Sequence, residues 1–194
     1  MKVSGTKVAE HRAALVETAG KLLKERGFDG AGVVEICREA GLSQGALYGQ
    51  FKSKNALAAE AVRTAFADGA AVWNELRDNA PDALTAFLDA YLSDTHLMDA
   101  GSGCLITACI SEVRRQDDVI GAAFTEGLSA MVELMQHALP TGTPPEEARR
   151  RALTLVSSLV GSVALARAVE ATDPALAREI LSAARNELEQ FAIR

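Results

Sequence analysis

The chain has 194 residues, of which 48% are hydrophobic and only 5% aromatic, and its formal net charge is −6. Ala, Leu, Val and Glu are abundant, which favours helices, because strands recruit β-branched and aromatic side chains. No stretch approaches the ~20 unbroken apolar residues of a membrane span. The first eleven residues lack the apolar core of a secretion signal, so we expect a cytoplasmic protein.

Apolar residues recur at helical spacing along the chain, and no segment alternates for long enough to predict a strand. Gly27 ends the first helix, as a C-terminal glycine does, and Gly41 ends the second. Ser43 is placed to cap the third. The expected helices span about 7–26, 33–40, 44–50, 54–77, 81–98, 104–115, 117–139, 146–171 and 174–193. The predicted fold class is therefore all-α, with about nine helices.

The charge is unevenly distributed. Residues 1–55 hold nine Lys or Arg and six Asp or Glu, a balance of +3, whereas the remainder holds eleven and twenty, a balance of −9. A basic head on an acidic body is the asymmetry expected when only the head contacts phosphates. We therefore expect nucleic-acid contacts in the N-terminal part. With the helix-turn-helix at 33–51 and the family resemblance, both described below, the expected domains are a helix-turn-helix DNA-binding domain at 1–53 and a larger helical ligand-binding and dimerisation domain at 54–194.

The cysteines and histidines predict neither a disulfide framework nor a metal site. Cys37, Cys104 and Cys109 form no CxxC pair, and their odd number suits reduced thiols. The three histidines are scattered, without the helical pair of a zinc site. No phosphate-cradling glycine motif and no Ser/His/Asp or Cys/His pairing is visible. We expect no cofactor and no catalytic residues; an enzyme or carrier on a helical scaffold is the alternative reading.

The segment 33–51 carries the clearest functional signal. Two short helices joined by a tight turn form a helix-turn-helix, which can place its second helix in the major groove of DNA. Ser43 at the N-cap leaves backbone N–H groups that can bind a phosphate. Gln44 suits an adenine edge, and the small Gly45 and Ala46 allow close approach to the groove wall.

Two further residues extend this expected contact. Tyr48 lies one turn beyond Gln44 and can offer its hydroxyl to a phosphate. Lys54 begins the next helix, where its ammonium and the helix N-terminus both attract a phosphate. The alternative is a glycine-punctuated helical hairpin with no nucleic-acid role.

Gly27-Phe28 and the run ICREAGLSQGALYGQFKSKNAL at 36–57 resemble the DNA-binding signature of the TetR family of repressors. Gly32 stands where a Ser or Thr usually caps the second helix, Gly49 where a larger polar residue is usual, and Gln50 where His is commonest. Gly49 and Gln50 are expected to alter the operator sequence rather than the fold. The DNA contacts that the motif and the resemblance together predict are Ser43, Gln44, Gly45, Ala46, Tyr48, Gln50 and Lys54.

The last two helices have apolar stripes, and the resemblance implies that they pair with their symmetry mates in a homodimer. Such a dimer places two reading helices about 34 Å apart, one turn of DNA, on a palindromic site. Small residues at Ser157, Gly161 and Ala168 allow close helix approach. The expected interface residues are Val156, Leu159, Val160, Val163, Ile180, Ala184 and Leu188. The alternative is that these stripes pack inside the monomer.

The middle helices carry the larger apolar side chains with a few polar ones among them, the usual lining of a small-molecule site. The resemblance implies an effector pocket between these helices. The expected lining is Phe66, Trp73, Phe87, Tyr91, Cys104, Thr107, Phe124 and Met131. The alternative is that each is ordinary core. Cys104 follows a glycine-rich loop at a helix start, a position that raises thiol reactivity; an inert buried thiol is the other reading.

Taken together, these features predict a ligand-responsive transcriptional repressor that binds a palindromic operator as a homodimer. A small, mostly hydrophobic effector is expected to shift the dimer toward a state that releases DNA, by tilting the helix at 54–77. Ligand-assisted binding or activation stays open at this point.

Overall fold

A computed structural model describes residues 5–101 and 103–193; Ser102, Arg194 and the first four residues of the N-terminal segment lie outside the described residues. Within them the fold is all-α, with ten helices and no strand. The helices are α1 (Gly5–Gly30), α2 (Val33–Glu39), α3 (Gln44–Gln50), α4 (Lys54–Asn79), α5 (Ala83–Tyr91), α6 (Asp94–Met98), α7 (Leu105–Val113), α8 (Asp118–Ala138), α9 (Pro145–Val169) and α10 (Pro174–Ile193).

The all-α class is confirmed, with one helix more than the nine predicted. The helix expected over 81–98 divides into α5 and α6 after Tyr91. Ser93 accounts for the break, because its hydroxyl accepts a hydrogen bond from the His96 N–H at 3.1 Å and so starts a new helix. The apolar periodicity runs through this break, which is why it predicted one helix instead of two.

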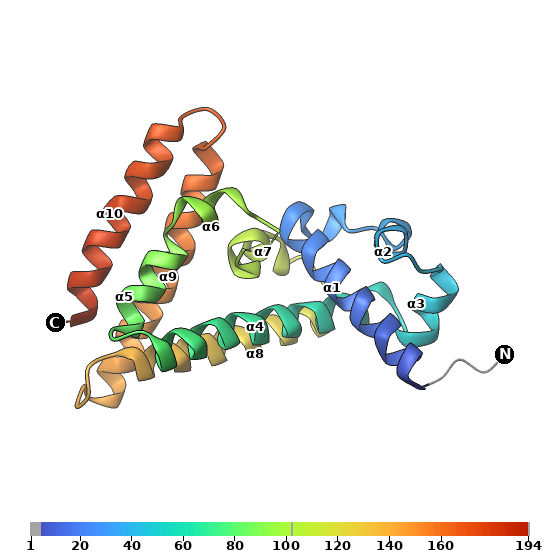
Figure 1. Ribbon diagram of the computed structural model, residues 1–194, viewed down its shortest axis with the longest axis horizontal. Coiled ribbons are helices and arrows are strands. Elements are labelled where there is room, and N and C mark those ends of the chain that lie inside the picture. The colour runs from blue at the N-terminus through green and yellow to red at the C-terminus, as the bar shows by residue number, and fades with distance from the viewer. Residues whose placement is uncertain (1–4, 102, 194) are drawn as a thin grey trace.

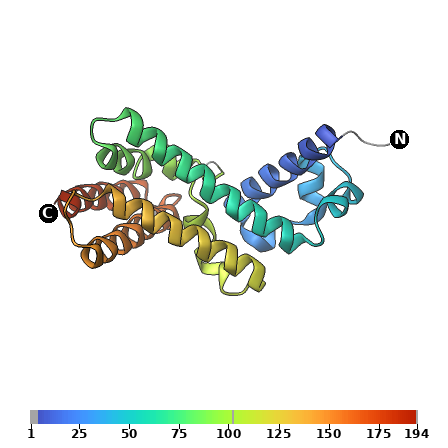
Figure 2. The ribbon, with the colours of Figure 1, turned by 90° about the horizontal axis from the view of Figure 1, so that it is seen from below.

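The molecule consists of a small head and a larger helical body (Figure 1). Helices α1 to α3 form the head at one end, and α9 and α10 lie at the opposite end of the body. Helix α4 runs from the head into the body alongside α8, as both views show (Figure 2). Helix α7 lies between the head and the body, and packs against α1.

The head is held together by a small apolar core. Leu15 and Leu22 of α1, Leu47 of α3 and Leu57 of α4 are fully buried. The turn between α2 and α3 depends on Gly41, whose φ of 67° lies in the left-handed region. Through this turn the Leu42 N–H donates to the Cys37 carbonyl at 2.9 Å, which satisfies the end of α2.

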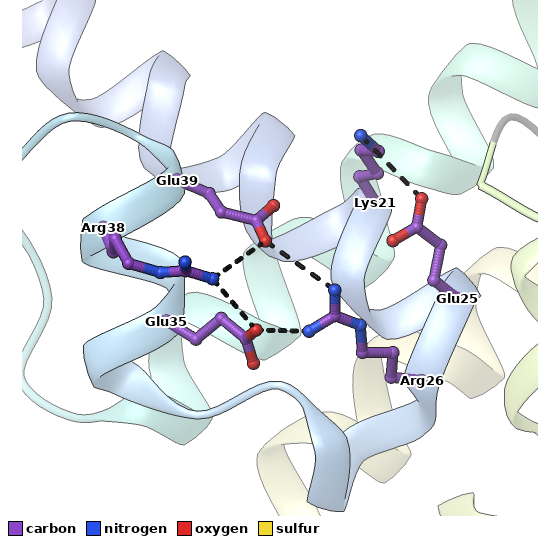
Figure 3. A network of polar contacts seen from close by, with 6 residues as sticks. All are labelled: Lys21, Glu25, Arg26, Glu35, Arg38 and Glu39. Atoms are coloured by element: carbon purple, nitrogen blue, oxygen red, sulfur yellow. Dashed lines mark hydrogen bonds and ion pairs between the residues drawn. The ribbon is translucent and has the colours of Figure 1, made fainter.

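An exposed network of ion pairs fastens α2 to the end of α1 (Figure 3). The Arg26 guanidinium pairs with Glu35 and lies 3.8 Å from Glu39. Arg38 contacts the same two carboxylates at 3.3 and 3.7 Å. Two cations and two anions thus neutralise one another at the base of the helix-turn-helix, although solvent screens each pair.

Among the described residues, only α9 has the length and composition of a membrane span, with a mean hydropathy of 1.7 over its most apolar 18 residues. In the structure this helix packs against α8 and α10, with Leu155, Leu159 and Val163 fully buried. A central helix of a helical bundle has the same composition, because it too is surrounded by apolar side chains.

Candidate DNA-reading surface and effector pocket

Helix α3 has one buried side and one exposed side. Leu47 is fully buried in the head, whereas Ser43, Gln44 and Gly45 are exposed. Tyr48 is 55% exposed, unusually high for an aromatic side chain of this size. The Ser43 hydroxyl caps the helix by accepting the Ala46 N–H at 3.1 Å. The helix therefore presents a small polar face with one aromatic hydroxyl to solvent.

Two of the predicted DNA contacts are engaged within the chain. The Gln50 carboxamide donates to the Val8 carbonyl of α1 at 3.1 Å. The Lys54 ammonium donates to the Phe28 carbonyl at 2.8 Å. Arg12, which sequence reasoning did not single out, donates to the Gln50 carbonyl at 2.9 Å and lies over the Phe51 ring. Gln50 and Lys54 thus hold α3 and α4 against α1.

A cavity of about 550 Å³ lies in the body between α4, α5, α7 and α8. Six of the eight predicted pocket residues line it: Phe66, Trp73, Phe87, Tyr91, Cys104 and Met131. Phe124 and Thr107 do not line the cavity and instead contact residues that do. The Phe124 ring packs edge-on against Phe66 with centroids 5.6 Å apart, and the Thr107 hydroxyl lies 3.2 Å from the Tyr91 hydroxyl.

One corner of the cavity is polar, and sequence reasoning missed most of it. His96 of the short α6 lines the cavity beside Tyr91, and Lys24 reaches it from α1 of the head. The His96 Nε2 accepts the Cys104 N–H at 3.0 Å, and its Nδ1 faces the Tyr91 carbonyl. Burial lowers the pKa of His96, so the ring stays neutral in the fold. No spacing motif reveals this corner, because its residues come from separate helices.

Arg167 of α9 supports this corner from behind. Its guanidinium donates to the carbonyls of His96 at 2.6 Å and Leu97 at 3.3 Å, which end α6. Burial lowers the pKa of Arg167 and raises that of the Tyr91 hydroxyl well above its usual range. The tyrosine therefore stays a neutral phenol that can donate or accept a hydrogen bond in the cavity wall.

The cysteines occupy two kinds of environment. Cys37 and Cys109 are buried, and burial raises the pKa of both thiols, that of Cys109 to about 12. Cys104 is half-buried and lines the cavity at the start of α7. No three His, Cys, Asp or Glu side chains of the described residues gather into a possible metal site.

Most of the residues predicted for the dimer interface are buried within the single chain. These are five of the seven, namely Val156, Leu159, Val160, Val163 and Leu188. Ile180 and Ala184 are half-buried. The outward face of α9 includes the small residues expected from the sequence to allow close helix approach, Ser157, Gly161 and Ala168, together with Leu153, Ala164 and Leu165.

A helix-turn-helix head joined to a helical body with an apolar cavity defines a DNA-binding transcriptional regulator. Two family models match the chain. Residues 15–61 match the model of bacterial regulatory proteins of the tetR family, and residues 80–178 match the C-terminal domain of LmrA/YxaF-like transcriptional regulators. The chain therefore belongs to the TetR family, as its sequence motif predicts, and members of this family are transcriptional regulators rather than enzymes.

Similar proteins agree with this assignment. An uncharacterized HTH-type transcriptional regulator of Mycobacterium tuberculosis is 28% identical over 163 residues, which cover 80% of this chain and 84% of that protein. The HTH-type transcriptional repressor NemR of Escherichia coli is 28% identical over 142 residues, which cover 70% of this chain and 71% of that protein.

Solved structures show the same fold. The crystal structure of reduced E. coli NemR has a TM-score of 0.80 and 23% identity, and covers 93% of this chain and 95% of that one. A TetR transcriptional regulator from Legionella pneumophila has a TM-score of 0.79 and 20% identity, with 99% of this chain and 100% of that one covered. At these identities the likeness concerns the fold alone.

Proposed function

We propose that the chain is a ligand-responsive repressor that binds a palindromic operator as a homodimer and is released by a small, hydrophobic effector. The observation that carries this proposal is the course of α4. One uninterrupted helix of 26 residues, about 39 Å long at 1.5 Å per residue, begins beside the reading helix and carries Phe66 and Trp73 of the cavity wall. A shift of α4 at the cavity must therefore move the head.

The DNA contacts come from the exposed face of α3. Gln44 and Tyr48 face solvent one turn apart, and Gly45 adds no bulk between them and the groove. The exposed N-terminus of α3 at Ser43 receives a backbone phosphate. In this proposal Lys54 reaches a phosphate only by leaving the Phe28 carbonyl, and Gln50 serves chiefly to hold α3 in place.

The dimer forms through the outward faces of α9 and α10. Leu165 is 61% exposed, and together with Leu153 and Leu176 of the same faces it forms an apolar surface that a second copy would cover. Gly161 at the middle of the α9 face allows close helix approach.

The regulator acts on DNA in the cytoplasm, where its reduced cysteines are stable.

The effector fills the cavity of the body. The walls are mostly aromatic and aliphatic. Tyr91, His96 and Cys104 place hydrogen-bonding groups at one corner, and the charged residues Lys24, Asp68 and Asp99 also belong to the lining. A molecule with an apolar ring system and one polar group matches this distribution. To release DNA, the effector must bind the dimer whose heads are displaced more tightly than the dimer whose heads fit the operator.

The test is binding of the purified protein to the DNA flanking its own gene, by fluorescence anisotropy against excess random duplex at several salt concentrations. Sequence-selective binding with a steep salt dependence is the expected result. Weak binding that is equal for all sequences, repeated with duplexes selected from a random pool, would overturn the proposal.

Dimerisation is tested by sedimentation. Gly161→Arg places a long cation on the outward face of α9 and is expected to convert dimer to monomer without unfolding it. Ser129→Arg, at an exposed position of α8, adds the same charge elsewhere and should leave the dimer intact. A wild-type protein that sediments as a monomer at micromolar concentration would exclude this assembly.

A further inference from the structure

Helix α1 is kinked near its C-terminal end, at Gly27, and we call this kink the joint. Gly27 interrupts the helix with φ 71° and ψ −176°, a conformation that side-chain-bearing residues essentially avoid. The helical turns resume through Phe28 to Gly30. Gly27 and Phe28 are both buried, Phe28 at 2% exposure, whereas Arg26 and Asp29 on either side are exposed.

The carboxylate of Glu112, from α7 of the body, occupies this joint. Its Oε2 accepts the Phe28 N–H at 2.8 Å. A Cβ on residue 27 would collide with both carboxylate oxygens of Glu112. Glycine therefore does two things here: it adopts the left-handed φ, and it leaves the space into which the carboxylate fits. Eighty-four residues separate the two partners in the sequence.

The carbonyl of the same residue, Phe28, is bound by the first residue of α4. The Lys54 ammonium donates to the Phe28 carbonyl at 2.8 Å. The backbone of Phe28 is thus bound on its N–H by an anion of the body and on its carbonyl by a cation at the start of α4. Bonds to charged groups are about twice as strong as neutral ones, so both partners hold this backbone firmly.

Helix α7 connects the joint to the cavity. Its start at Cys104, Leu105 and Ile106 lines the cavity, and Glu112 lies near its other end. One turn before Glu112, the buried Cys109 thiol contacts the Leu23 carbonyl of α1 at 3.3 Å. Two side chains of α7 therefore contact the backbone of α1. Cys109 contacts the Leu23 carbonyl before the joint, and Glu112 binds the Phe28 N–H directly after it.

We infer that Glu112 is a positioning residue for DNA reading: by binding the Phe28 N–H it sets the orientation of the head on the body. A displacement of α7 at the cavity moves the carboxylate, and the backbone of Phe28 and the Lys54 end of α4 follow. This inference rests on the proposed function and adds a second connection between cavity and head, beside α4. It also assigns a role to a half-buried carboxylate that the reading surface and the cavity do not use.

Three substitutions at residue 112 separate hydrogen bonding from charge. Glu112→Gln removes the charge but keeps an oxygen that can accept the Phe28 N–H. Glu112→Asp keeps the charge but is one methylene too short, and Glu112→Ala removes both. The matched control is Glu126→Ala, because Glu126 also pairs with α4, through Arg63 at 3.0 Å, but is exposed and distant from the joint.

Two measurements are made on the full-length protein. Amide exchange of a peptide spanning residues 26–31 is followed by mass spectrometry, and affinity is measured by anisotropy for a duplex that the wild-type protein has selected from random sequences. In the Asp and Ala variants we expect about tenfold faster exchange and about tenfold weaker binding, the effect of losing one charge-assisted hydrogen bond. The Gln variant and Glu126→Ala should stay within about threefold of wild type.

The outcomes separate this inference from the proposed function. If the wild-type protein selects no duplex, the proposed function fails. The amide-exchange data still test whether Glu112 binds the Phe28 N–H. If exchange accelerates but DNA affinity is unchanged, Glu112 is merely structural and the inference is overturned. The inference would also be overturned if Glu112→Asp behaved like the wild type while Glu112→Gln was impaired. The charge of residue 112, and not its hydrogen bond, would then determine DNA affinity. Thermal unfolding checks that each variant is folded at the assay temperature.

Discussion

The indole ring of Trp73 meets the ring of Phe87 edge-on, with centroids 5.2 Å apart and an interplanar angle of 81°. This contact joins α4 to α5 at the cavity wall, and the Phe87 ring in turn lies 5.5 Å from Tyr91. The helix that begins directly after the helix-turn-helix is therefore in direct contact with the aromatic side of the cavity. A ligand that separates these rings acts on α4.

Trp73 is the single tryptophan of the chain, so its emission reports on the pocket. We expect the uncharged, apolar probe N-phenyl-1-naphthylamine to quench this emission by energy transfer as it fills the cavity. Phe87→Leu removes an edge-on contact worth about 0.5–1.5 kcal/mol, and should weaken probe binding up to about tenfold. Val34→Ala, at an exposed position of α2, is the control. Equal affinities for all three proteins would place the probe elsewhere.

On α3, we expect Gln44 to contact a DNA base and Tyr48 to contact a backbone phosphate. Gln44→Ala should cost about 1–3 kcal/mol of binding to the selected duplex and nothing to random DNA, because it removes a base contact. Tyr48→Phe removes only the hydroxyl and should weaken binding to all sequences alike. Anisotropy titrations with both duplexes measure this, with Ser129→Ala at an exposed position of α8 as the distant control. An equal loss on both duplexes for Gln44→Ala would mean that Gln44 contacts phosphate.

The cysteines should differ in reactivity. A thiol with a pKa of about 12 is deprotonated to only about one part in 10⁴ at pH 8, which describes Cys109; burial also raises the pKa of Cys37. Cys104 is half-buried and lines the cavity. Iodoacetamide should therefore label Cys104 first, as followed by peptide mass spectrometry, and Cys104→Ser should abolish the fast phase. Slower labelling of Cys104 than of Cys37 and Cys109 would refute a reactive thiol.

Stability should fall as the solution becomes mildly acidic. Burial chiefly lowers the pKa of His96, and the nearby Arg167 and Lys24 lower it further, while Asp99 opposes them. The unfolded chain takes up a proton near pH 6.5 and the folded chain does so only at lower pH. The free energy of unfolding contributed by His96 is therefore complete above pH 6.5 and is lost below it.

Urea unfolding at pH 7.5 and 5.5 measures this contribution. The loss between the two pH values should be smaller in His96→Gln than in the wild type, because the variant has no imidazole to protonate. His137→Gln, at an exposed position of α8, should retain the wild-type pH dependence. An identical loss in all three proteins would assign the effect to carboxylates alone.

Gly27 and Glu112 should be coupled in stability. Gly27→Ala introduces a Cβ into the position of the carboxylate and strains a backbone that costs about 1–3 kcal/mol without glycine. In a Glu112→Ala background the collision is absent and only the backbone strain remains. The double-mutant cycle is thus expected to be non-additive by about 0.5–3 kcal/mol in the free energy of unfolding. Additivity would mean that the two residues do not interact.

The helix-turn-helix was predictable to the residue because its signals are local. The range 44–50 expected for the reading helix is the one observed, since the Ser43 cap and the Gly41 turn act within a few residues. The same kind of signal at Ser93 was overlooked, and α5 and α6 were merged for that reason. Six of the eight residues predicted for the pocket do line the cavity, because large apolar side chains on amphipathic helices turn inward.

The exposed face of α9 was predictable only in part, through Ser157, Gly161 and Ala168, and the polar corner of the cavity was not predictable. Helix α9 is apolar on two sides, with Leu159 buried and Leu165 exposed, and periodicity alone does not tell which side meets its own chain. Thr107 and Phe124 do not line the cavity but contact the lining residues Tyr91 and Phe66, and the sequence does not distinguish a lining residue from the one behind it. Tertiary packing alone distinguishes such pairs.

By itself the sequence determined the all-α class, the helix-turn-helix with its exposed Gln44 and Tyr48, and the family. These depend on capping, turn and amphipathic preferences that act over a few residues, so they can be recognised from the amino-acid sequence alone. Only the tertiary structure decided that Glu112 binds the Phe28 backbone, that Lys24 of the head reaches the cavity, and which face of α9 is open. The physical reason is that such contacts join residues scores of positions apart, and the energies that select them exist only once the helices have packed together.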